Sequence, residues 1–161
     1  FVPSLKAPVG VLTSNQPNEV EWEDIAYGWK MAKAVGGLDI GQVVVVKAQM
    51  VIAVEAIEGT DACIQRAGEL ADDETAVIKV LKPGEDERLD APSVGKSTIE
   101  NMINAGATCL CIEADKALFF DMDESIRLAE AHNISVVGIK PEHLEKGKPW
   151  PPDIAGRTWS Q

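Results

Sequence analysis

Three charged residues, Asp86, Arg88 and Asp90, are spaced two apart in a segment whose prolines and glycines exclude a helix. If this segment is extended, side chains alternate between its faces, so the two carboxylates lie on one side with the guanidinium between them. Carboxylates bind divalent cations, and a guanidinium can bind a phosphate through two hydrogen bonds. The set is suited to hydrolysis of a phosphate ester or anhydride. The alternative interpretation is a solvated loop held by salt bridges among the same residues.

The overall charge makes the position of the cations informative. The chain has 161 residues and a net charge of −11, which argues against general nucleic-acid binding and against electrostatic docking to anionic lipid. An acidic enzyme for an anionic substrate must concentrate its cations locally. Lys79, Lys82 and Arg88 lie within ten residues of one another, which fits that requirement. No stretch approaches the ~20 apolar residues that a membrane helix needs.

The elements before this segment supply a second set of polar residues. The runs 43–47 and 50–57 are rich in Val and Ile and predict a hairpin, followed by a helix over about 60–70. Glu58, Gly59, Thr60 and Asp61 stand at the start of that helix, where free backbone N–H groups can bind an anion. The alternative is an ordinary helix cap with Thr60 or Asp61 as the capping oxygen.

The remaining pattern predicts an α/β domain with a mixed β-sheet and helices on its faces. An apolar strand over 76–81 leads into the charged segment, and helices and strands alternate from there to about residue 140. We expect residues 1–20 to be a connector containing one short strand, residues 21–140 to be the α/β domain, and residues 141–161 to be an irregular tail. The tail is predicted to pack over a groove through Trp150 and Trp159.

Several other classes of site are disfavoured. The sequence has neither Gly-x-Gly-x-x-Gly nor Gly-x4-Gly-Lys, and its two histidines suit no Ser-His-Asp triad. Cys109 and Cys111 alternate in an apolar run and are interpreted as buried residues in a reducing compartment rather than metal ligands.

Three stretches resemble the C-terminal domain of the metal-dependent bacterial UDP-2,3-diacylglucosamine pyrophosphatases of lipid A biosynthesis. They are Leu38-Asp39-Ile40-Gly41-Gln42, residues 53–61 and Lys82-Pro83-Gly84-Glu85-Asp86-Glu87-Arg88-Leu89-Asp90-Ala91-Pro92. The resemblance runs from about Pro8 to Ile139. Asp86, Arg88, Asp90, Pro92 and Gly95 match the family pattern, whereas Glu85 stands where members usually have Gln.

The resemblance implies hydrolysis of UDP-2,3-diacylglucosamine to UMP and 2,3-diacylglucosamine 1-phosphate with Mg²⁺ or Mn²⁺ as cofactor. Which carboxylate is a metal ligand and which is a base stays open. The expected site residues are Asp86, Asp90, Arg88 and Lys82 for catalysis, Lys79, Gly59, Thr60, Pro83 and Gly95 for substrate binding, and Asp86, Asp90, Glu58 and Asp61 for the metal.

The resemblance also implies partners and a location. We expect an N-terminal domain that this chain lacks, the diacylated UDP-sugar as substrate, no nucleic acid, and a possible homodimer. The expected location is cytoplasmic, at the inner membrane through the lipid substrate alone. The competing hypothesis is a non-catalytic domain that binds a UDP-sugar or phospholipid and regulates a larger protein.

Overall fold

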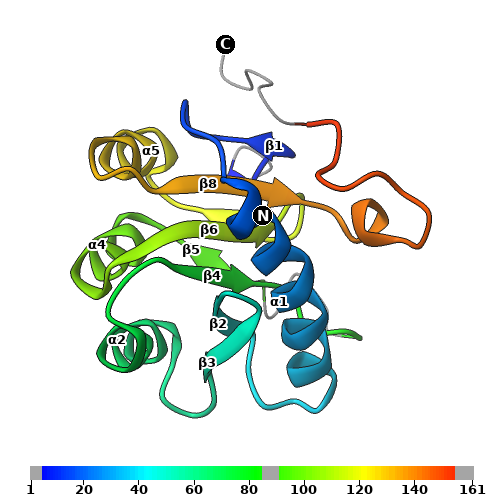
Figure 1. Ribbon diagram of the computed structural model, residues 1–161, viewed down its shortest axis with the longest axis horizontal. Coiled ribbons are helices and arrows are strands. Elements are labelled where there is room, and N and C mark those ends of the chain that lie inside the picture. Colours follow the sequence, from blue (N-terminus) through cyan, green and yellow to red (C-terminus); the bar gives the residue numbers. More distant parts are fainter. Residues whose placement is uncertain (1–4, 85–90, 155–161) are drawn as a thin grey trace.

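The fold is an α/β domain built on a mixed sheet of six strands, in the order β1-β8-β6-β4-β2-β3 (Figure 1). The computed structural model describes residues 5–84 and 91–154. The elements are β1 (Gly10–Val11), α1 (Glu19–Gly37), β2 (Val43–Lys47), β3 (Met50–Val54), α2 (Thr60–Ala71), β4 (Thr75–Lys79), β5 (Ser93–Val94), α4 (Lys96–Ala105), β6 (Ala107–Glu113), β7 (Leu118–Phe119), α5 (Met122–Ala131), β8 (Ser135–Ile139) and a 3₁₀ turn (Pro141–Leu144).

Strand direction determines which loops meet at each edge of this sheet. The central strands β4, β6 and β8 are parallel, whereas β2 runs antiparallel to β4, β3 antiparallel to β2, and β1 antiparallel to β8. Val43, the first residue of β2, pairs with Lys79, the last of β4. The same edge therefore holds the end of β4, the start of β2 and the end of β3. This arrangement confirms the predicted mixed sheet and hairpin.

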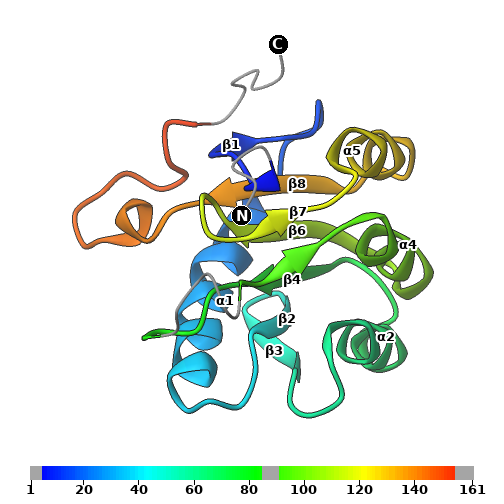
Figure 2. The same cartoon turned by 180° about the vertical axis from the view of Figure 1, so that it is seen from behind.

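Helices cover both faces of the sheet: α1 lies on one face and α2, α4 and α5 lie on the other (Figures 1 and 2). The side chains of β2 alternate between the two cores. Val43 and Val45 join the core under α2, α4 and α5, and Val44 and Val46 join the core under α1. Strands covered on both faces need such unbroken apolar runs.

The helix α1 buries Trp22, Ile25, Trp29 and Ala32 against the sheet and also holds the hairpin turn. Asn18 and Glu21 form a reciprocal capping box at its start. Asp24, which is buried on α1, accepts hydrogen bonds from the backbone N–H groups of Ala48 and Gln49, the two positive-φ residues between β2 and β3. Positive φ at both central positions matches the right-handed twist of a hairpin.

The two ends of the described chain pack onto the domain. In the predicted connector, β1 is the edge strand of the sheet and Ala7 exchanges backbone hydrogen bonds with Ala117 and Asp115. In the predicted tail, the Trp150 indole N–H donates to the Trp22 carbonyl, with the two rings edge to face at a centroid distance of 5.6 Å. Trp159 lies outside the described residues.

The expectation for the cysteines can be checked directly against these elements. All three cysteines are buried, as predicted for Cys109 and Cys111. None of the helices within residues 5–84 and 91–154 has the length and apolar character needed to cross a membrane.

Candidate active site

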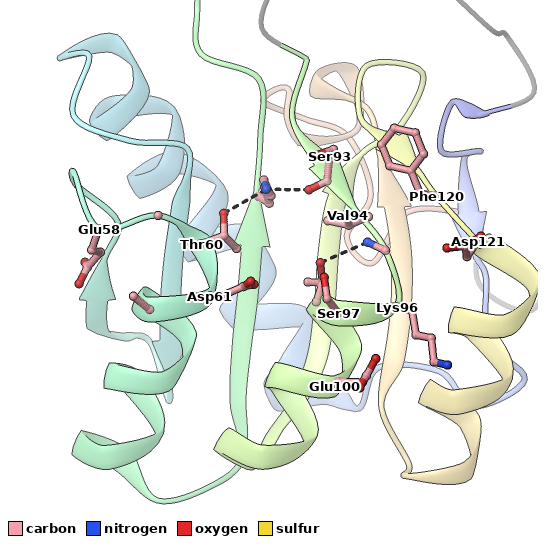
Figure 3. Close-up of a pocket in the computed structure, with 15 residues that line it drawn as sticks. Glu58, Thr60, Asp61, Ser93, Val94, Lys96, Ser97, Glu100, Phe120 and Asp121 are labelled. Carbon is pink, nitrogen blue, oxygen red and sulfur yellow. Dashed lines mark hydrogen bonds between the residues drawn. The ribbon is translucent and has the colours of Figure 1, made fainter.

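An open pocket of about 650 Å³ lies at the edge of the sheet where β4 ends and where α2 and α4 begin (Figure 3). Ligand sites in α/β sheets occur at this edge, outside the carboxyl ends of the strands. The pocket is lined by Glu58, Gly59, Thr60, Asp61, Ala62, Lys79, Ser93, Val94, Gly95, Lys96, Ser97, Thr98, Glu100, Phe120 and Asp121.

Two helices start at glycines on opposite walls of the pocket. Gly59 is the N-cap of α2 with φ of 91°, a conformation that favours glycine, and no side chain caps this helix. Gly95 is the N-cap of α4, and its N–H donates to the Thr98 hydroxyl. First-turn N–H groups and the helix dipole favour an anion at such ends. The alternative interpretation, a helix cap formed by the Thr60 or Asp61 side chain, is wrong, because no side chain caps α2.

Lys79 occupies the floor between the two helix starts. It is 8% exposed, and its Nζ lies 3.0 Å from the Thr60 hydroxyl and 2.7 Å from the Ser93 carbonyl oxygen (Figure 3). Burial lowers the pKa of Lys79, while the negative charges of Glu55 and Asp61 act in the opposite direction. A cation held in a largely desolvated position interacts strongly with an anionic ligand.

The two acidic residues at the start of α2 differ in their surroundings. Both line the pocket, but Asp61 points toward its middle, whereas Glu58 lies at its outer edge (Figure 3). Glu58 is bound by the guanidinium of Arg66, and this hydrogen bond lowers the pKa of the carboxyl group. Arg66 also donates to the Val54 carbonyl at the end of β3.

Two of the predicted catalytic and substrate-binding residues lie away from the pocket. Lys82 forms a 3.0 Å ion pair with Asp39, which follows α1. Pro83 lies against the last turn of α1, with its Cδ 3.2 Å from the Cβ position that a side chain at Gly36 would occupy. The segment after β4 therefore turns toward α1 before it reaches the charged residues.

The charged residues on which the catalytic prediction centres are not among those described. Asp86, Arg88 and Asp90, together with Glu85, lie outside the described residues. The chain leaves the pocket at Lys79 and returns to it at Ser93. Within residues 5–84 and 91–154, no three His, Cys, Asp or Glu side chains gather as a metal site would require.

The structure thus brings together Glu58, Gly59, Thr60, Asp61, Lys79 and Gly95 of the predicted set. It also adds residues that the sequence did not single out. Glu55 accepts the Thr60 hydroxyl at 3.0 Å, and its place as a charged residue near the end of the apolar run 50–57 was the available signal. The other additions, for which the sequence offered no clear signal, are Ser93, Lys96, Ser97, Glu100, Phe120 and Asp121.

Comparison with known proteins identifies the domain. The family model described as the LpxI C-terminal domain matches residues 8–137. A curated relative, UDP-2,3-diacylglucosamine pyrophosphatase LpxI of Caulobacter vibrioides, is 34% identical over 143 residues, which are 84% of this chain and 51% of the relative. The chain spans about half the length of that relative. With its fold and pocket in the matched region, the chain belongs to the LpxI C-terminal domain family.

Proposed function

We propose that the protein hydrolyses the pyrophosphate bond of UDP-2,3-diacylglucosamine, releasing UMP and 2,3-diacylglucosamine 1-phosphate for lipid A biosynthesis. The observation that carries this proposal is the position of Lys79, buried between two glycine-capped helix starts at the carboxyl edge of β4. The name of the Caulobacter vibrioides relative gives the same substrate and reaction class.

In this proposal the pocket binds the phosphate groups of the substrate. Lys79 and the first-turn N–H groups of α2 and α4 neutralise the negative charge that a phosphoryl group carries in the transition state. Lys96, at the start of α4, adds a second cation on the pocket wall and is paired at 2.8 Å with Glu124. Arg88 is proposed to grip the same phosphoryl group bidentately.

A requirement for Mg²⁺ or Mn²⁺ is part of the proposal. Asp61 is the carboxylate that the first turn of α2 directs into the pocket, whereas Glu58 is engaged by Arg66. The described residues do not form a metal site by themselves, so Asp86 and Asp90 would have to complete one around Asp61. A divalent cation there would supply Lewis acidity and charge neutralisation at the phosphoryl group.

The proposal extends to the setting of the reaction. The substrate is held between this domain and a second domain, and the protein works in the cytoplasm, meeting the inner membrane through its lipid substrate. The relative is about twice as long as the segment matched here, which supports a second domain. A homodimer stays a prediction.

The test is release of UMP from UDP-2,3-diacylglucosamine by the protein at its natural full length. We expect turnover with Mg²⁺ or Mn²⁺ and its loss with a chelator. Lys79→Gln should lower turnover by roughly a hundredfold or more, the usual cost of a lost transition-state contact. Lys30→Gln, an exposed lysine on α1, is the matched control and should keep wild-type turnover. Substrate binding without UMP release under any of these conditions would favour the non-catalytic binding domain instead.

A further inference from the structure

Three side chains from different elements form a hydrogen-bonded row beneath the pocket. Glu55 directly follows β3, Thr60 is the first residue of α2, and Lys79 is the last residue of β4. The Thr60 hydroxyl lies 3.0 Å from Glu55 Oε2 and 3.0 Å from Lys79 Nζ. The row therefore connects a carboxylate to the buried lysine through one hydroxyl.

The direction of each hydrogen bond in this row follows from the chemistry of the groups. A carboxylate only accepts, so the single hydroxyl hydrogen of Thr60 goes to Glu55. The same hydroxyl must then accept a hydrogen bond from Lys79 Nζ, and the Ser93 carbonyl oxygen accepts a second one from Lys79 Nζ. An ammonium group has three N–H bonds, so one N–H of Lys79 remains. Among the residues that the structure describes, this third N–H has no acceptor, and Lys79 lines the pocket.

The carboxylate at the end of the row is held at both oxygens. Glu55 Oε1 accepts the backbone N–H of Gln42 at 2.7 Å, while Oε2 accepts from Thr60. The backbone N–H of Glu55 donates to the Val43 carbonyl, so its position is tied to the sheet register. Glu55 therefore has little freedom to turn away from Thr60.

This geometry changes the expected role of Thr60. Its hydroxyl hydrogen is taken by Glu55, so the hydroxyl has no hydrogen to donate to a phosphate. Only its backbone N–H, in the first turn of α2, is available for that purpose. The side chain instead serves as an acceptor that fixes the orientation of Lys79.

We propose that Glu55 is a positioning residue that acts through Thr60, fixing Lys79 so that its remaining N–H points at a phosphate group in the pocket. The inference rests on the proposed function for the identity of that ligand and assigns Glu55 and the Thr60 hydroxyl a role without direct substrate contact. Removing either group frees Lys79 to rotate and weakens the binding of a phosphate anion.

Conservative variants separate this role from general stability. Thr60→Ser keeps the hydroxyl and should bind inorganic pyrophosphate within about twofold of wild type. Thr60→Val has nearly the same shape but no hydroxyl, and Glu55→Gln replaces one of the two acceptor oxygens of Glu55 with an N–H donor, so each should weaken pyrophosphate binding about tenfold or more, as for loss of a charged hydrogen bond. Glu23→Gln removes one exposed negative charge on α1 and is the matched control for Glu55→Gln.

Two measurements on the full-length protein decide the question. Calorimetric titration gives pyrophosphate affinity, and ¹⁵N-lysine NMR reports the Nζ resonance of Lys79, assigned by its loss in Lys79→Gln. We expect this resonance to shift on pyrophosphate binding in wild type and Thr60→Ser, and to move or disappear in Thr60→Val. Wild-type affinity and an unchanged Lys79 resonance in both Thr60→Val and Glu55→Gln would overturn the inference, as would a wild-type protein that binds no pyrophosphate. If Glu55→Gln does not fold, the Thr60 pair decides by itself.

The outcome is distinguishable from failure of the proposed function. Pyrophosphate binding that depends on Glu55 and the Thr60 hydroxyl, in a protein that releases no UMP, would uphold the positioning role while removing the hydrolase assignment. UMP release at the wild-type rate in both Glu55→Gln and Thr60→Val would uphold the hydrolase assignment and remove the positioning role.

Discussion

The segment that carries the charged residues starts at a buried ion pair, and replacing Glu113 by glutamine should destabilise the protein measurably. Glu113 ends β6, and its Oε1 lies 2.6 Å from Lys33 Nζ and 3.0 Å from the backbone nitrogen of Leu81. Lys33 Nζ also donates to the Leu81 carbonyl at 2.9 Å. Both backbone polar groups of Leu81 are therefore held by one ion pair, directly before Lys82 and the charged segment.

The expected magnitude follows from burial. The Glu113 side chain is 3% exposed and that of Lys33 is 25% exposed, so the pair is largely desolvated. Removing one partner of a buried pair typically costs about 3–5 kcal/mol. The glutamine oxygen can still accept from Leu81, and the lysine can reach water, so we expect the lower figure of about 1–3 kcal/mol for a lost charged hydrogen bond. Glu113→Ala loses both bonds and should reach the higher range.

The assay is urea unfolding followed by far-ultraviolet circular dichroism, comparing midpoints at equal slope. The control is Glu124→Gln, which breaks the exposed ion pair between Glu124 and Lys96 and should leave the midpoint unchanged. The reasoning is refuted if Glu113→Gln has the same midpoint as Glu124→Gln, since burial would then make no difference to how much an ion pair stabilises the protein.

Three further predictions concern packing, pH and catalysis. Gly68→Ala should destabilise the protein despite its better helix propensity, because the new Cβ would lie 2.7 Å from the Ala105 carbonyl oxygen; Gly37→Ala, with nothing within 4 Å, should be neutral or stabilising by thermal unfolding. Burial raises the pKa of the Cys63 thiol to about 12, so as pH rises the unfolded chain loses this proton before the folded chain does. The free energy of unfolding should therefore fall as pH rises above about 9. Urea midpoints at pH 8 and pH 10 check this, and a constant or rising midpoint contradicts it. Arg88→Lys should lower turnover of the full-length protein by about a hundred- to a thousandfold with little change in melting temperature, since lysine cannot bind a phosphate bidentately; near-normal turnover would return Arg88 to the salt-bridge interpretation.

The fold was predictable because its apolar runs are long. The five residues of β2, Val43–Lys47, are almost all valine, and such a run suits a strand covered on both faces. The gathering of Gly59, Thr60 and Lys79 was also predictable in outline, because residues that follow strands of an α/β sheet meet at one edge.

The internal geometry of the site was not predictable from spacing. Glu55 reaches Thr60 through the conformation of the short connection from β3 to α2, which includes Gly59 at a φ of 91°, and the spacing of the residues does not encode that conformation. Lys82 lies three residues after Lys79, yet the chain turns between them, so Lys82 pairs with Asp39 rather than entering the pocket. The strand β5 has only two residues, Ser93–Val94, too few for any periodic signal.

The buried Asp24 gives the hairpin a fixed length. It holds the turn at Ala48 and Gln49 at one end of the sheet, while Glu55 stands beside Thr60 at the other end. Each strand residue advances the chain by about 3.3 Å and reverses the side-chain direction. An insertion or deletion in either arm therefore loses the turn contacts to Asp24 or moves Glu55 away from the Gln42 N–H that it accepts. Keeping both contacts therefore requires one hairpin length, although the turn is remote from the pocket.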